Sequence, residues 1–134
     1  MLLTLLPSVP VWKESNKLVF DRKFYDGVLK YCSLWPGNVR CVMREGNKEP
    51  PKFGLVTLQK EELPFEIHIV ESCNNITESH LTDSNTVLAS GDNHELLHIS
   101  YLCKQKSIRC IYIIEYTLKT RLQIVALDAP TILH

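Results

Sequence analysis

Apolar residues along this chain gather in short runs, and most of these runs predict strands. A strand in a buried sheet needs only about four to eight residues rich in Val, Ile and Leu. Seven segments have this character: residues 2–6, 18–20, 39–43, 54–58, 65–70, 86–89 and 108–114. Residues 65–70 alternate apolar and polar positions, which gives that strand two different faces. Residues 108–114 are almost wholly apolar, which predicts a strand covered on both faces.

Three other segments repeat their apolar residues at helical spacing: residues 22–34, 94–105 and 117–127. Asp21 is a good N-cap for the first helix, and Trp35-Pro36-Gly37 ends it. The positions expected to face the core are Phe24, Val28, Tyr31, Cys32 and Trp35 in the first helix, Leu96, Leu97, Ile99, Leu102 and Cys103 in the second, and Leu118, Leu122, Val125 and Ala126 in the third. The segments 7–17 and 45–52 are predicted to be loops, and 71–85 to hold one helical turn near 77–81.

The alternation of strands and helices predicts an α/β protein with a Rossmann-like, mostly parallel sheet and helices on both faces. We expect at least five strands, with the runs at Leu2, Val39, Val87 and Ile111 parallel and central. Ligands of such sheets bind beyond the carboxyl ends of the strands. Those ends are residues 8–16, 44–46, 90–94 and 115–117, and polar residues cluster there.

Length and composition narrow the class of protein. The chain has 134 residues, which fits one domain, and its 15 basic residues balance 15 acidic ones. A net charge of zero argues against electrostatic binding to nucleic acid. No apolar run approaches the roughly 20 residues of a membrane helix, and the apolar start lacks the basic residues of a signal peptide. Five cysteines without a CxxC pair predict reduced thiols in the core and a cytoplasmic protein.

The sequence His94-Glu95-Leu96-Leu97-His98 matches the HExxH motif of zinc hydrolases. Two histidines four residues apart share one face of a helix, so both could bind one zinc ion while the glutamate acts as a base. A third ligand is missing, however, and the motif stands at the very start of a predicted helix. We therefore expect no metal here, and a zinc hydrolase is the less favoured alternative.

The turn Ser90-Gly91-Asp92-Asn93-His94 joins a predicted strand to a predicted helix. Glycine lets the backbone approach a ligand closely, and the free amides of a helix N-terminus favour an anion. Ser90, Gly91, Asp92 and His94 are therefore candidate substrate-binding residues. The alternative is a simple turn in which Asp92 or Asn93 caps the helix.

Glu115 and Tyr116 follow the most apolar run of the chain, at the same predicted edge of the sheet. A charge in this position must turn outward or be paired, so both residues are candidates for contact with a substrate. A capping or solvated role for Glu115 stays open. The basic residues Arg22, Lys23, Arg40 and Arg44 are interspersed, and they are expected to be solvated. No residue is assigned a catalytic role.

Three stretches of the sequence resemble a known family of enzymes. They are Leu18-Val19-Phe20-Asp21-Arg22-Lys23-Phe24-Tyr25-Asp26-Gly27 followed by Trp35-Pro36-Gly37, then Val87-Leu88-Ala89-Ser90-Gly91-Asp92, and Ile111-Tyr112-Ile113-Ile114-Glu115-Tyr116-Thr117-Leu118-Lys119-Thr120-Arg121. Together they resemble the N-terminal half of nucleotide-sugar-dependent glycosyltransferases of the two-Rossmann-domain (GT-B) type, in the group-1 or family-4 class.

The resemblance implies that residues 1–134 form a single acceptor-binding domain, the N-terminal half of a longer two-domain enzyme that transfers a hexosyl group to a hydroxyl. The implied partners are a sugar or glycan acceptor and a nucleotide sugar bound by a separate C-terminal domain. No metal or other cofactor is implied, this domain alone is expected to be inactive, and peripheral membrane association is compatible with the family. A non-catalytic Rossmann-like binding module is the alternative.

Overall fold

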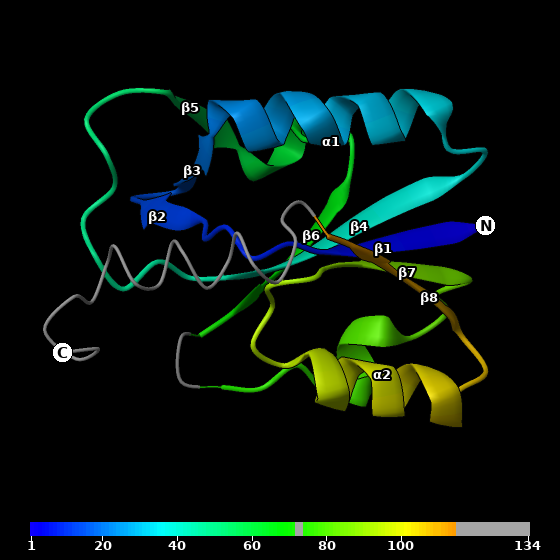
Figure 1. Ribbon diagram of the computed structural model, residues 1–134. Helices are drawn as coiled ribbons and strands as arrows, with labels where there is room; N and C mark the ends of the chain where they lie inside the picture. The colour runs from blue at the N-terminus through cyan, green and yellow to red at the C-terminus, as the bar shows by residue number, and fades with distance from the viewer. Residues whose placement is uncertain (72–73, 115–134) are drawn as a thin grey trace, which may run out of the picture.

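The computed structural model describes residues 1–71 and 74–114, and its centre is a parallel sheet of five strands (Figure 1). These strands are β1 (Leu2–Leu6), β4 (Asn38–Arg44), β6 (Glu66–Val70), β7 (Thr86–Ser90) and β8 (Arg109–Ile113). They lie in the order β6-β4-β1-β7-β8, and every neighbouring pair is parallel. The first strand of the chain is therefore the central one, with Leu3 opposite Val39 on one side and Thr86 on the other. The chain is an α/β protein with a mostly parallel central sheet.

A second, antiparallel sheet packs beside α1 in the order β2-β3-β5. Its strands are β2 (Trp12–Glu14), β3 (Lys17–Asp21) and β5 (Leu55–Gln59). The prediction of a loop over residues 7–17 is wrong at β2. Ser15 adopts a positive φ of 56°, which allows the chain to reverse tightly, so that Trp12 pairs with Val19. The Pro, Ser and Asn residues around this short strand concealed it.

Helices cover both faces of the parallel sheet (Figure 1). The α-helices are α1 (Arg22–Leu34) and α2 (Leu96–Gln105), and the 3-10 turns are η1 (Lys60–Glu62) and η2 (Glu78–Leu81). Helix α1 lies over one face, and α2 lies over the other, where Leu81 of η2 joins the same core. The predicted cap of α1 is confirmed, because the Asp21 carboxylate accepts a hydrogen bond from the Phe24 amide at 2.9 Å.

Helix α2 begins at Leu96, two residues later than predicted. The Asn93 side-chain oxygen accepts a hydrogen bond from the Glu95 amide at 2.9 Å, and the Asn93 amide donates to the Ser90 carbonyl at 3.1 Å. These bonds hold residues 90–95 in a turn. His94 and Glu95 therefore precede the helix instead of forming its first turn.

Side chains of the parallel sheet alternate between two cores, as the two-residue period of a strand requires. Leu5 belongs to the core under α1 together with Val28 of that helix. Leu6 belongs to the core under α2 together with Ile99. Leu97 was predicted to face this second core but is 89% exposed. The reason is that residues two positions apart point to nearly opposite sides of a helix, and Ile99 faces the sheet.

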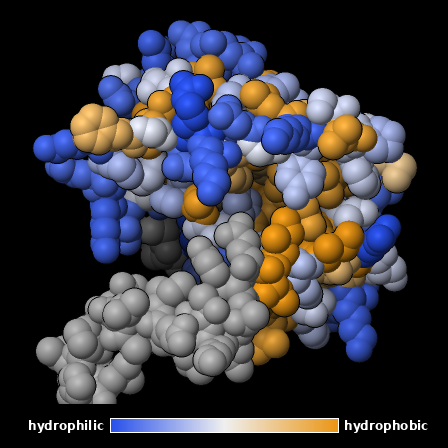
Figure 2. All heavy atoms as spheres, turned by 45° about the horizontal axis from the view of Figure 1, so that its top comes forward, coloured by the Kyte–Doolittle hydropathy of each residue, from blue (hydrophilic) through white to orange (hydrophobic). Residues whose placement is uncertain are grey.

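Strand β8 is parallel to its neighbour as predicted, but it is not central. Within the described residues it pairs with β7 alone and forms one edge of the sheet. Ile111 and Ile113 of β8 are 38% and 39% exposed. The prediction that this strand is covered on both faces is therefore wrong at these two residues. Figure 2 shows that hydrophobic side chains gather on part of the surface of the face that it presents. An apolar run indicates a parallel strand, but it does not distinguish a central position from an edge.

The cysteines of the described ranges are free thiols. Cys41 and Cys103 are buried in the two cores, whereas Cys32 and Cys110 are half-buried. Burial raises the pKa of the Cys41 thiol and raises that of Cys103 to about 12, so both are held as unreactive apolar side chains.

Several predictions concern residues outside the described ranges, namely Cys73, the candidate site residues Glu115 and Tyr116, and the helix over 117–127. Among the helices that are described, none has both the length and the apolar character that crossing a membrane requires.

Candidate functional site

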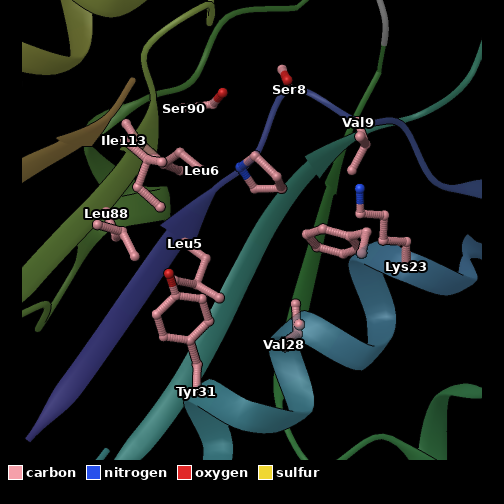
Figure 3. Close-up of a pocket in the computed structure, with 14 residues that line it drawn as sticks. Leu5, Leu6, Ser8, Val9, Lys23, Val28, Tyr31, Leu88, Ser90 and Ile113 are labelled. Carbon is pink, nitrogen blue, oxygen red and sulfur yellow. The ribbon is translucent and has the colours of Figure 1, made fainter. Parts of the chain in front are cut away.

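A pocket of about 240 Å³ lies where the carboxyl ends of β1 and β7 adjoin (Figure 3). The chain leaves β1 toward β4 on one side of the sheet, and β7 leads to β8 on the other side. Connections that diverge in this way leave a crevice between two neighbouring strand ends. The pocket is lined by residues 5–9 at the end of β1, by five residues of α1, by residues 88–90 at the end of β7, and by Ile113 of β8.

The described lining of this pocket is mostly apolar and carries a few polar groups. Leu5 and Leu88 lie along the sheet side, and Tyr31 reaches in from α1 (Figure 3). Ser8 and Ser90 provide hydroxyl groups at the carboxyl edge of the sheet. A concave apolar surface with a few polar groups is typical of a small-ligand site.

Helix α1 turns Gly27 toward the pocket, and this residue keeps the space open. A Cβ atom built on Gly27 would meet nothing within 4 Å. Glycine in the interior of a helix lowers stability by about 0.5–1 kcal/mol relative to alanine, so the empty space is maintained at a cost to the helix. The sequence analysis did not single out Gly27, although a glycine inside a well-capped helix was an available signal.

The predicted turn at residues 90–94 contributes one residue to this pocket. Ser90 lines it, whereas Gly91, Asp92 and His94 do not. The Gly91 amide donates a hydrogen bond to the Ile113 carbonyl at 2.6 Å, and an added Cβ would lie 2.8 Å from that oxygen. The Ser90 hydroxyl donates to the Asp92 carboxylate. The turn therefore packs closely against the end of β8, and Gly91 permits that approach.

The three polar residues of the HExxH sequence have separate structural partners. The Glu95 carboxylate forms an ion pair with Arg44 and accepts a hydrogen bond from the Ile76 amide at 3.1 Å. His98 donates from Nε2 to the Ile76 carbonyl at 2.8 Å, whereas His94 is exposed and precedes the helix. No three His, Cys, Asp or Glu residues of the described ranges are grouped so as to hold a metal ion. In this chain the motif attaches the segment before η2 to the start of α2.

Arg40 and Arg44 were expected to be solvated, and the structure contradicts this. Arg44 pairs with Glu95, and Arg40 is only 8% exposed. Arg40 donates to the Glu66 carboxylate at 3.1 Å and to the carbonyls of His80 and Thr82 at 3.1 and 2.8 Å. A hydrogen bond from His68 and the nearby Arg40 hold the pKa of Glu66 below its usual value. These groups fasten η2 to β4 and β6 on the face opposite α1, away from the pocket.

The fold and the pocket define an α/β protein with a small apolar crevice at the carboxyl edge of a parallel sheet. Comparisons of the chain with protein-family models, with curated protein sequences and with solved structures find no significant match. The function is therefore inferred from the residues of the site.

Proposed function

We propose that this chain is the acceptor-binding domain of a nucleotide-sugar-dependent glycosyltransferase of the two-domain GT-B type. The observation that carries the proposal is where the pocket lies in the sequence. Its lining includes Lys23, Phe24 and Gly27, residues 88–90, and Ile113. These positions fall in the three stretches, 18–27, 87–92 and 111–121, that resemble this family.

The topology of the sheet supports the same proposal. Numbered along the chain, the five parallel strands lie in the order 3-2-1-4-5, which is the order of a Rossmann-like sheet up to its fifth strand. Ligands of such sheets bind where the strand order reverses, and here that point lies between β1 and β7, at the pocket. One connection differs from the usual pattern, because β5 and η1 stand between β4 and β6 in place of an α-helix.

The chemistry available in the pocket suits the binding of an acceptor. The apolar wall formed by Leu5, Leu88 and Ile113 can pack against a ring or an alkyl group. The Ser8 hydroxyl can donate to or accept from an acceptor hydroxyl, and the Ser90 hydroxyl, which donates its proton to Asp92, can accept from one. Both serines lie at the carboxyl edge of the sheet, so the acceptor hydroxyl would face outward, where a nucleotide sugar on a second domain could meet it. The role of this chain is then to bind and orient the acceptor.

The proposal is tested in the complete gene product, expressed with any coding sequence that flanks residues 1–134. Transfer of labelled hexose from UDP- and GDP-sugars to a panel of hydroxyl acceptors is measured for the wild type, for Gly27→Leu and for Gly27→Ala. Leucine fills the space that Gly27 leaves in the pocket, so we expect transfer to fall at least about tenfold without loss of folding. Alanine adds one methyl group and should preserve most of the transfer.

Two results would contradict the proposal. One is the absence of both sugar transfer and nucleotide-sugar hydrolysis with every donor tested. The other is full transfer activity in Gly27→Leu, because a filled pocket could then not be the acceptor site.

A further inference from the structure

We propose that the pocket between β1, β7 and α1 selects a hydroxyl acceptor that carries an anionic group beside a single ring. That the ligand is an acceptor rests on the proposed function, whereas the charge and the size of the ligand are inferred from the pocket itself. The charge is indicated by Lys23, and the size is indicated by the volume and the apolar walls.

Lys23 is the one charged residue among the fourteen described residues that line the pocket. No carboxylate belongs to that lining, and the described part of the chain offers Lys23 no ion pair. Figure 3 shows the Lys23 side chain on the same side of the pocket as Val9. An ammonium group at the edge of an apolar pocket favours a ligand with a negative charge at that point.

The position of Lys23 in α1 strengthens this electrostatic preference. The first turn of α1 begins with Arg22 and Lys23 and contains no acidic residue. The N-terminus of a helix carries a partial positive charge, so two cations there are unfavourable unless an anion is close. Asp21 supplies one carboxylate before the helix, and its Oδ2 accepts the hydrogen bond from the Phe24 amide. Asp26 supplies a second carboxylate one turn further along α1, and an anionic ligand group beside Lys23 would add to this compensation.

The volume and the apolar walls of the pocket limit the size of the ligand and favour an apolar ring. A volume of about 240 Å³ is below the roughly 300–1,000 Å³ of sites for drug-sized molecules, so one ring fills it. Phe24 and Tyr31 of α1 and Leu88 of β7 provide the apolar surface for that ring. Ser8 and Ser90 lie at the edge where the acceptor hydroxyl must be exposed for reaction.

Three small probes of matched size separate charge from shape: the anion 4-hydroxybenzoate, its neutral methyl ester, and the cation tyramine. Dissociation constants for the chain are measured from amide chemical-shift changes in NMR titrations at low salt. We expect shifts at Ser8, Lys23 and Ser90, and binding of 4-hydroxybenzoate about three- to tenfold tighter than binding of the ester. Tyramine should bind most weakly, and added salt should weaken only the binding of the anion.

Substitution of Lys23 tests the assignment of the charge. Lys23→Gln should weaken 4-hydroxybenzoate to the level of the ester and leave the ester unchanged, whereas Lys23→Arg should retain the preference. Lys30→Gln is the matched control, because Lys30 is an exposed lysine of the same helix that does not line the pocket.

Equal affinity for the anion and the ester, or an unchanged preference in Lys23→Gln, would overturn the selection of an anion. Binding of none of the probes, or tighter binding of UDP than of 4-hydroxybenzoate at the same residues, would overturn the assignment as well. These results are obtained without any transfer assay. A failure of the glycosyltransferase proposal would therefore appear separately, as absent transfer by a protein that still binds the anionic probe.

Discussion

Arg44, the last residue of β4, forms an ion pair with Glu95, the residue that precedes α2, across 51 positions of the sequence. The Glu95 side chain is only 6% exposed, and its second oxygen accepts the hydrogen bond from the Ile76 amide. Arg44 also donates to the Asn74 carbonyl at 2.6 Å. This pair therefore joins the carboxyl end of the sheet, the segment before η2 and the start of α2, and it occupies the glutamate that a zinc hydrolase would need as a base.

Replacing Glu95 with Gln should lower the free energy of unfolding by about 2–3 kcal/mol. The substitution leaves the Arg44 guanidinium only partly exposed and without its carboxylate, and breaking a buried pair from one side is costly. Urea denaturation followed by circular dichroism measures the change. Glu14→Gln, at an exposed residue of β2, is the control and should change stability by less than about 0.5 kcal/mol. Similar values for the two variants would show that the ion pair contributes nothing.

Substitution of alanine for Gly37 and for Gly27 should change the stability of the protein in opposite directions. A Cβ on Gly37 would overlap the Met1 carbonyl oxygen, which also accepts the Asn38 amide hydrogen bond at 2.9 Å. Gly37→Ala should therefore destabilise the protein by about 1–3 kcal/mol. Gly27→Ala should stabilise it by about 0.5–1 kcal/mol, because the site is open and the helix gains propensity. Thermal melting of both variants provides the comparison, and a shift in the same direction for both would contradict the structure.

Stability should fall as the pH drops below about 6.5, partly because of His80. Burial, followed by the nearby His68, lowers the pKa of His80. The unfolded chain therefore takes up this proton at a higher pH than the folded chain, and the difference favours unfolding in acid. Protonation would also remove the hydrogen bond that His80 Nδ1 accepts from the Thr77 amide at 2.9 Å.

The variant His80→Gln tests this pH dependence, because glutamine does not titrate. The urea midpoint of the wild type should drop between pH 7.5 and 5.5, and that of His80→Gln should drop less. His94 is exposed and lies away from His68 and His80, so the urea midpoint of His94→Gln should change with pH as that of the wild type does. Parallel curves for wild type and His80→Gln would exclude a contribution from His80.

Cys41 and Cys103 should resist alkylation in the native protein at pH 8. Both side chains are buried, and burial raises the pKa of each thiol, so the reactive thiolate is scarce. Peptide mapping after treatment with iodoacetamide identifies the labelled positions. Both residues should be labelled within minutes in guanidinium chloride. Rapid labelling of either one in the native state would indicate local opening of its core.

Much of the fold was predictable because its signals are local. The cap at Asp21, the spacing of apolar residues in α1 and the runs that became β1, β4 and β7 all act within a few neighbours. The incorrect predictions depended on tertiary position. Nothing within residues 108–114 shows that β8 ends the described sheet, and nothing near Trp12 shows that it pairs with Val19.

The candidate site was predictable only as an edge of the sheet. Ser90 is the last residue of β7, a strand that could be recognised from the sequence, and it does line the pocket. Lys23 and Gly27 reach the same pocket because α1 packs across the end of β1, and this packing depends on contacts between distant segments. Arg40 and Arg44 were misjudged for the same reason, since their partners Glu66 and Glu95 lie 26 and 51 positions away.

The central position of β1 has a consequence for the newly made chain. Leu3 obtains its first strand partner when Val39 has been made, but its second partner, Thr86, comes 47 residues later. At about 5–20 residues per second, translation leaves one edge of β1 unpaired for several seconds. An open apolar strand edge is a template for pairing with other chains. Chains that end before β7 therefore leave this edge of β1 unpaired, and they should aggregate more readily than chains in which β7 has been made.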